Sequence, residues 1–195
     1  IKLTVPYGPG GSPDVLARLL GQQLSATLHQ PVVIENRPGA NGAVAAQAVA
    51  RAPADGYALL VADTGHLAIN PALYPKLPYD PERDFVPIGL ASWTPFFLVV
   101  NSAKVAATNW RELVALAQAQ PGRLSYGSSG NGSPHHLATE VLKADARIDL
   151  LHVPFKGVAE SVPALLGGQI DLMLVALPSV ASAIESGKLR VIAVS

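Results

Sequence analysis

The sequence has no cysteine among its 195 residues, which excludes disulfide bonds, thiolate zinc sites and cysteine nucleophiles. Only 6% of the residues are aromatic, and acidic and basic residues balance at 14 each, so the composition indicates neither a base-stacking surface nor a basic stripe. Because of this composition, we expect no nucleic-acid partner. No apolar run approaches the ~20 residues of a membrane-spanning helix, because the longest candidate, residues 170–183, is broken by Asp171 and Pro178.

Apolar side chains are abundant: 49% of the residues are hydrophobic, which is enough for one large domain or two small lobes. In the first block of the chain, strand and helix signals alternate, beginning and ending with a strand. We expect these five elements at residues 2–7, 12–28, 31–36, 43–51 and 58–62. This order is typical of a parallel sheet with helices on its faces.

The chain then changes character before the same alternation returns. The proline-rich residues 70–87 predict irregular surface chain with one short helical turn. Residues 88–101 predict a strand that bends at Pro95 and passes from one sheet into another. Further helices are expected at 110–120, 133–144, 161–166 and 178–186, and further strands at 124–127, 149–154, 171–175 and 189–195.

We therefore predict an α/β fold with two lobes. Residues 1–95 form the first part of lobe 1, residues 96–188 form lobe 2, and residues 189–195 form a crossover strand that returns toward lobe 1. Because the chain stops on a strand with no closing element, we expect the C-terminal complement of lobe 1 to be missing. The first residues read as a strand, so we expect no signal peptide in this chain, and this leaves the compartment open.

Each block carries the same local design at its first strand-to-helix turn. The strand ends in Tyr-Gly, a glycine-rich turn follows, and Ser-Pro opens a helix, over residues 7–13 in the first block and 126–134 in the second. We expect the serine at the N-cap, where its oxygen accepts a backbone N–H, and the proline at the first helical position. The glycines allow positive φ and let a ligand approach the main chain closely.

Such a turn leaves unpaired N–H groups at the positive end of a helix dipole, which favours an anion. Two turns that face a shared cleft, one from each lobe, would hold one small anion from both sides, at the sheet edge where ligands of open α/β sheets lie. The alternative is that both are ordinary, well-capped turns of the kind that any α/β protein contains. The repetition of the design favours an anion or carboxylate cleft.

At these turns and beyond, the sequence resembles the tripartite tricarboxylate transporter receptor family, the TctC or Bug proteins of Bordetella and related proteobacteria. The resemblance includes Pro-Gly-Gly-Ser-Pro-Asp-Val-Leu-Ala-Arg at 9–18 and Glu-Asn-Arg-Pro-Gly-Ala-Asn-Gly at 35–42. It continues at residues 54–57, 70–74, 84–88, 127–133, 152–157 and 166–171. Each segment is weak alone, but together they occur in family order and cover nearly the whole chain.

The resemblance implies a periplasmic-binding-protein-like fold of type II, a Venus flytrap with two α/β lobes joined by crossing strands. It implies a periplasmic receptor that captures a small carboxylate metabolite (a dicarboxylate, an amino acid or an aromatic acid) for the membrane subunits of a tripartite tricarboxylate-type transporter. We expect a monomer without catalytic residues, cofactor or metal, and therefore not an enzyme.

The expected ligand-binding residues lie on the two turns and on two neighbouring loops. The carboxylate would accept hydrogen bonds from backbone N–H groups of Gly10, Gly11 and Ser12 in the first lobe and of Asn131, Gly132 and Ser133 in the second. The resemblance adds the following residues to the cleft: Tyr7, Thr64, Ser128, Ser129, Pro154, Phe155 and Lys156. Phe155 stands where the family commonly has tyrosine, so one hydroxyl is missing from the expected site.

Other readings of the same residues are weaker. A Ser/His hydrolase could use Ser129 or Ser133 in the same cleft, but no complete G-x-S-x-G motif is present, because Asn131 stands at its last position. His135 and His136 are adjacent on a helix and point about 100° apart, which disfavours a shared metal ion. A dinucleotide-binding motif lacks its third glycine. A receptor that signals instead of feeding a transporter stays open.

Overall fold

The computed structural model describes all residues, 1–195, and the chain forms two units, Ile1–Leu90 and Ala91–Ser195. Unit 1 contains a parallel sheet with the strand order β2-β1-β3. Its elements follow the predicted alternation: β1 (Lys2–Val5), α1 (Ser12–Leu28), β2 (Val33–Asn36), α2 (Ala43–Ala50) and β3 (Ala58–Leu60). The predicted strands are right in place and order, but each is two residues too long.

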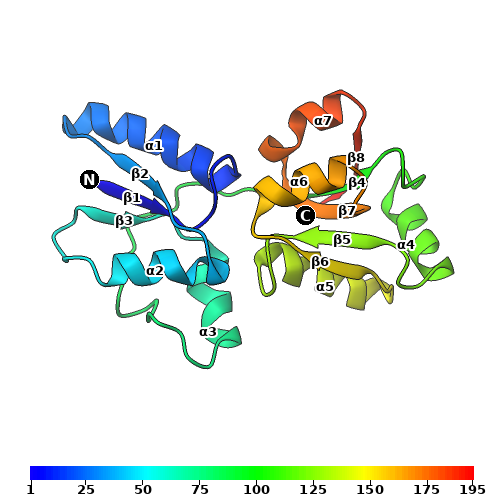
Figure 1. Ribbon diagram of the computed structural model, residues 1–195, viewed down its shortest axis with the longest axis horizontal. Coiled ribbons are helices and arrows are strands. Elements are labelled where there is room, and N and C mark those ends of the chain that lie inside the picture. The colour runs from blue at the N-terminus through cyan, green and yellow to red at the C-terminus, as the bar shows by residue number, and fades with distance from the viewer. The chain divides into compact units, whose positions relative to one another are not determined.

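Small residues let both helices of unit 1 pack closely on this sheet. Ala17 of α1 is fully buried against Leu3 and Val5 of β1, whereas Ala43 and Ala46 of α2 belong to a separate cluster. The two clusters reflect the two faces of the sheet, and Figure 1 shows α1 and α2 on opposite sides of it. The sheet is therefore covered on both faces, as its apolar strands require.

The proline-rich part of unit 1 is irregular, as predicted, except for the short helix α3 (Asn70–Leu73). A π-helical turn (Gly65–Ile69), which the sequence analysis did not predict, precedes it. The buried Tyr79 fixes the segment: its hydroxyl donates to the carbonyl of His66 at 2.7 Å and accepts from the Asn70 amide at 3.1 Å. The two hydrogen bonds of the Tyr79 hydroxyl thus hold a segment that has little regular secondary structure.

The strand predicted over residues 88–101 is wrong in its first half. Only β4 (Phe96–Asn101) forms, and residues 88–95 pair with no other strand. Val86, Ile88, Leu90 and Trp93 are 79–88% exposed. Their β propensity has no effect because a strand needs a neighbour to take its backbone hydrogen bonds. The predicted passage of one strand between two sheets is therefore not seen.

Unit 2 contains a five-stranded sheet with the order β6-β5-β7-β4-β8. Strand β4 is antiparallel to both of its neighbours, whereas β5 is parallel to β6 and β7. The other elements are α4 (Trp110–Ala119), β5 (Ser125–Ser128), α5 (Pro134–Ala146), β6 (Leu151–Pro154), α6 (Val158–Leu166), β7 (Leu172–Ala176), α7 (Ala181–Glu185) and β8 (Leu189–Val194).

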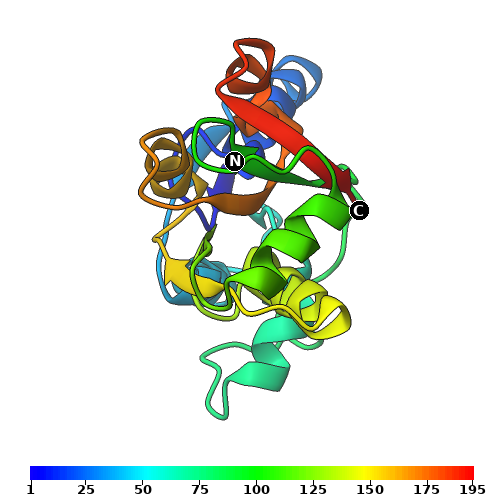
Figure 2. The same ribbon diagram turned by 90° about the vertical axis from the view of Figure 1, so that its right-hand side faces the viewer.

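The strands of unit 2 alternate side chains between two hydrophobic clusters. Leu98, Val100 and the helices α4 and α5 belong to one cluster, and Val99 and the helices α6 and α7 belong to the other. The period of two places a helical layer on each face, and Figure 2 shows this unit from the side of β8, with α4 and α5 separated from α6 and α7. The predicted cap of α4 is confirmed: the Asn109 side chain accepts the Glu112 N–H at 3.0 Å.

The last strand, β8, pairs with β4, so residues 189–194 belong to the sheet of unit 2. Their predicted return toward lobe 1 stays a prediction. None of the helices combines the length and the apolar character needed to span a bilayer.

Candidate functional site

Both glycine-rich turns occupy the same position in their sheets. The first follows β1, the middle strand of β2-β1-β3, and the second follows β5, the middle strand of β6-β5-β7. In both sheets these three strands are parallel, so their carboxyl ends meet at one edge. The chain moves from the middle strand first to one side and then to the other, which makes this edge the switch point where α/β sheets bind ligands.

The first turn is closed by a carboxylate of the chain itself. Gly10, at φ +87°, donates its N–H to Asp14 Oδ2 at 3.0 Å. The buried Asp14 also accepts two bonds of 3.0 Å from Arg18 and one of 2.9 Å from Asn36. Burial alone raises the pKa of Asp14, but the bonds from Arg18, Gly10 and Asn36 outweigh it and lower the pKa below the ordinary aspartate value. The Gly10 amide is therefore already satisfied.

The expected cap of the first helix is wrong. The N-cap of α1 is Gly11, without a side-chain cap bond, and Ser12 stands inside the helix. The first N–H groups of the helix are taken up by the backbone instead, since Asp14 and Val15 donate to the Gly11 carbonyl at 3.0 and 3.1 Å. Among the amides proposed for the ligand in unit 1, the Gly11 N–H donates to no protein acceptor.

Tyr7 is held by a neighbouring loop. Its hydroxyl donates to Asp63 Oδ2 at 2.6 Å, and Asp63 Oδ1 accepts the Gly65 N–H at 2.8 Å. Burial and the Asp63 charge raise the pKa of Tyr7 well above its ordinary value. The bond joins the turn after β1 to the loop after β3, where Thr64 is exposed. Tyr7 thus positions this edge, and its hydroxyl proton is committed to Asp63.

The second turn has the predicted serine cap. Ser133 Oγ accepts the His136 N–H at 3.3 Å, and Pro134 begins α5. The Ser133 N–H donates to the Gly130 carbonyl at 3.2 Å, and the Gly132 N–H donates to His136 Nδ1 at 3.1 Å. Asn131 is exposed, and its N–H donates to no protein acceptor. Two of the three amides proposed for the ligand in unit 2 are therefore engaged.

Two serines of this turn contact histidines. Ser129 Oγ lies 2.8 Å from His135 Nδ1, and Ser128 Oγ lies 2.7 Å from His152 Nε2. His152 stacks against both Tyr126 and His136, with ring centroids 4.7 and 4.1 Å away. Burial lowers the pKa of His152, and the neighbouring His136 lowers it further. No carboxylate hydrogen-bonds to His152, so that pair has no third member of a catalytic triad.

The segment after β6 extends the same edge. The Phe155 N–H donates to the Ser128 carbonyl at 3.1 Å, while its ring packs on the cluster of α6 and α7. Pro154 and Lys156 are exposed, and the Lys156 ammonium forms no ion pair within the chain. The structure thus brings Pro154 and Lys156 to the turn of unit 2 as solvent-facing groups, and uses the Phe155 ring for packing.

Sequence reasoning missed several residues of this edge. The third loop of unit 2, the 3-10 turn Leu177–Ser179 after β7, corresponds to the Thr64 loop of unit 1, and only the shared strand order reveals this. The acceptor roles of Asp14, Asp63 and His136 were also missed. A signal for two of them was available, because Asp14 and His136 each stand four residues after a turn glycine.

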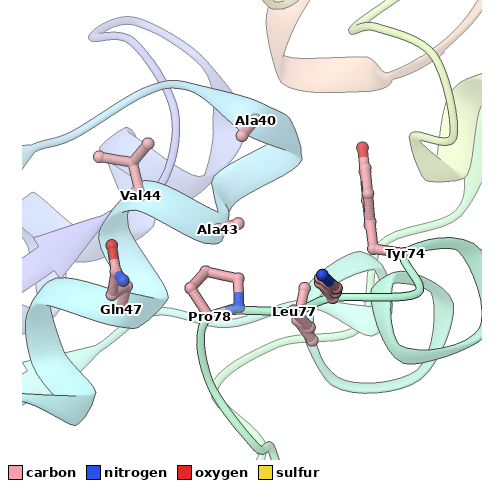
Figure 3. A pocket seen from close by; sticks show the side chains of 8 residues that line it. Ala40, Ala43, Val44, Gln47, Tyr74, Leu77 and Pro78 are labelled. Atoms are coloured by element: carbon pink, nitrogen blue, oxygen red, sulfur yellow. The ribbon is translucent and has the colours of Figure 1, made fainter.

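Unit 1 also contains a pocket of about 180 Å³ away from the turn (Figure 3). It lies between the start of α2 and the irregular segment 74–78. Its lining is Ala40, Ala43, Val44, Gln47, Tyr74, Lys76, Leu77 and Pro78, which includes none of the residues proposed for the ligand.

Known proteins share both the sequence and this architecture. The model of the tripartite tricarboxylate transporter family receptor, TctC, matches residues 16–195. The chain belongs to this family. Protein BugT of Bordetella pertussis is 37% identical to this TctC-family chain over 195 residues, which covers 100% of the chain and 60% of BugT. The family prediction is confirmed.

Solved structures of similar proteins cover the whole TctC-family chain. R. palustris Rpa4515 with adipate has a TM-score of 0.95 and 36% identity, over 64% of its own chain. The periplasmic binding protein BugD has a TM-score of 0.90 and 33% identity, also over 64% of its own chain. MatC from Rhodopseudomonas palustris with bound malate has a TM-score of 0.90 and 31% identity, over 66% of its own chain. The predicted periplasmic-binding-protein-like α/β fold is thereby confirmed, and the chain spans less than two thirds of BugT, Rpa4515 and BugD.

Proposed function

We propose that this TctC-family chain is the ligand-binding part of a periplasmic receptor that captures a small carboxylate for a tripartite transporter, and that it is not an enzyme. One observation carries the proposal. Each unit presents, after the middle strand of its sheet, a glycine-rich turn at a helix start with one amide that has no protein acceptor, Gly11 in unit 1 and Asn131 in unit 2.

These amides suit an anion for two reasons. Each lies at the N-terminus of a long helix, 17 residues for α1 and 13 for α5, where the backbone dipoles favour negative charge. A hydrogen bond from an amide to a charged acceptor contributes about 1.5–3 kcal/mol. Lys156 adds an unpaired cation beside the second turn.

We infer that dicarboxylates are the first class to test, because each turn offers an amide that suits a carboxylate. Rpa4515 with adipate and MatC with malate support this choice, since both ligands carry two carboxylates. Amino acids and aromatic acids stay in the test panel, because backbone amides recognise a carboxylate and not the rest of the molecule.

Calorimetric titration with adipate, malate, an amino acid and an aromatic acid tests the proposal. At least one ligand should bind, and K156Q should weaken its affinity several-fold, more at low salt than at high salt. K188Q is the matched control, because Lys188 is also exposed but lies between α7 and β8. The absence of heat from every ligand would contradict the proposal.

The Ser–His contacts keep a hydrolase as the rival to be tested. Ser129 lies within hydrogen-bond distance of His135, which is the geometry of an activated nucleophile. We expect no turnover of an activated ester by the native chain, and therefore no difference in the S129A and S133A variants. Turnover that disappears in either variant would favour the hydrolase.

A further inference from the structure

The pocket in unit 1 shares no residue with the two glycine-rich turns. Its volume is about 180 Å³, and Figure 3 shows Ala40 and Ala43, around the start of α2, on the side opposite Leu77 and Pro78 of the irregular segment. The space is open on the α2 side because an alanine side chain ends at Cβ. A longer side chain at position 40 or 43 would fill it.

Hydrogen bonds next to the pocket fix both of its walls to the same residue. Asn41, in the turn before α2, donates to Asn70 Oδ1 at 2.7 Å, and Asn70 Nδ2 donates to the Asn41 carbonyl at 3.0 Å. Asn70 Nδ2 also donates to the hydroxyl of Tyr79, which directly follows Pro78, at 3.1 Å. Asn70 and Tyr79 are both buried. The pocket is therefore preformed, which lowers the entropy cost of binding.

The walls and the volume suit one six-membered ring. A cavity of about 150 Å³ with apolar walls binds benzene, so the slightly larger pocket of unit 1 holds such a ring with one small substituent. Most of the lining is apolar: Ala40, Ala43, Val44, Leu77 and Pro78. Burial of a ring there removes apolar surface from water, and this favours binding. Malate has no comparable apolar body.

One cation lines the pocket, and no acidic residue does. Lys76 is exposed and takes part in none of the ion pairs of the chain. The side-chain amide of Gln47 is the other polar group on the α2 side, and it can donate to an oxygen. Because the charge of the lining is positive only, an anionic substituent on the ring complements it.

We propose that this pocket is a second binding site of the chain, for a small aromatic acid of the size of benzoate. The ring lies between α2 and the segment 74–78, and the carboxylate pairs with the Lys76 ammonium. The site goes beyond the proposed function, because it binds a ring by burial, whereas the turns bind a carboxylate through backbone amides. Each site can be occupied without the other.

Methyl NMR of the chain titrated with benzoate tests the site. The signals of Val44 and Leu77, which line the pocket, should shift and saturate. A40L should weaken this binding at least about tenfold, because the added carbons take the place of the ring. Ala40 is exposed, and its left-handed backbone is no harder for leucine, because alanine already carries the Cβ that causes the strain. A26L is the matched control, since Ala26 is exposed on α1 and outside the pocket.

Benzyl alcohol, a neutral ligand of similar size, tests the charge. K76Q should weaken benzoate about two- to fivefold and leave benzyl alcohol unchanged, because an exposed ion pair contributes little but is specific to the anion. K188Q is the control, since Lys188 is exposed and lies in unit 2. An equal effect of K76Q on the two ligands would contradict the assignment of an acid.

The outcomes for the pocket and for the turns are separable. Val44 and Leu77 signals that ignore benzoate, or that respond equally in A40L, would overturn the pocket site. Benzoate that moves only the Gly11 and Asn131 amides would also overturn it, while supporting the proposed function. If no carboxylate moves those amides, the proposed function fails, and the Val44 and Leu77 signals still decide the pocket.

Discussion

At the scale of single residues, the two turns are defined by what already occupies their amides. A glycine-rich helix start offers several N–H groups, and a side chain that reaches back from the first turn of the helix can satisfy some of them. Asp14 reaches Gly10 and His136 reaches Gly132, each across one helical turn. The amides that remain, Gly11 and Asn131, are the ones that an external anion can use without displacing a protein group.

Asp14 is expected to stabilise unit 1 as well as close its turn. D14N should lose about 1–3 kcal/mol of unfolding free energy, because Arg18, Asn36 and Gly10 would face a neutral acceptor. The folded-state pKa of Asp14 is lowered, so its contribution is complete above the unfolded-state pKa of about 3.9 and is lost as the pH falls through the folded-state value. Denaturant unfolding from pH 7 to 3 measures this.

The D14N variant should therefore show a weaker loss of stability in acid than the native chain. D145N is the control, because Asp145 is exposed and forms no ion pair. Equal denaturation midpoints for D14N and the native chain at pH 7 would show that the Asp14 network contributes nothing net.

At the scale of elements, one glycine is fixed by a neighbouring ring. Gly42 ends the left-handed turn before α2 at φ +80°, and an added methyl group would collide with the buried His66 ring and lie 3.0 Å from Pro6. The His66 ring cannot easily retreat, because Nδ1 lies 3.1 Å from the Asp63 amide and 2.8 Å from its carboxylate.

G42A should therefore cost about 3 kcal/mol or more, and G56A about 1–2 kcal/mol. Gly56 has the same kind of backbone, φ +83°, but open space around the position of a methyl group. The pair separates backbone strain from collision, and thermal unfolding of both variants measures it. Similar losses in the two variants would mean that the ring of His66 yields.

Element order was predictable from the sequence because periodicity and turn residues are local signals. Helix α1 was predicted over the right part of the chain although its N-cap was wrong, and the Asn109 cap of α4 was read from its position. The strand over 88–95 failed because strand formation depends on a partner that local sequence does not specify. The choice of acceptor for each turn amide failed for a similar reason, since it depends on which side chain reaches back by one helical turn.

At the scale of the whole molecule, each unit repeats one plan. Both sheets place the glycine-rich turn after the middle of three parallel strands, and unit 2 adds the antiparallel β4 and then β8. The two turns occupy the same position in their sheets and therefore have similar chemistry. In the sequence alone, this relation is visible only as two short, similar motifs. The shared strand order thus extends the candidate site to loops that carry no motif, such as Leu177–Ser179.

Each glycine-rich turn is proposed to bind a carboxylate through its unpaired amide, Gly11 in unit 1 and Asn131 in unit 2, and amide NMR of the chain titrated with malate or adipate tests this most directly. The signals of both Gly11 and Asn131 should move and saturate as ligand is added. Movement of only one signal, or of neither while other parts of the chain respond, would contradict it.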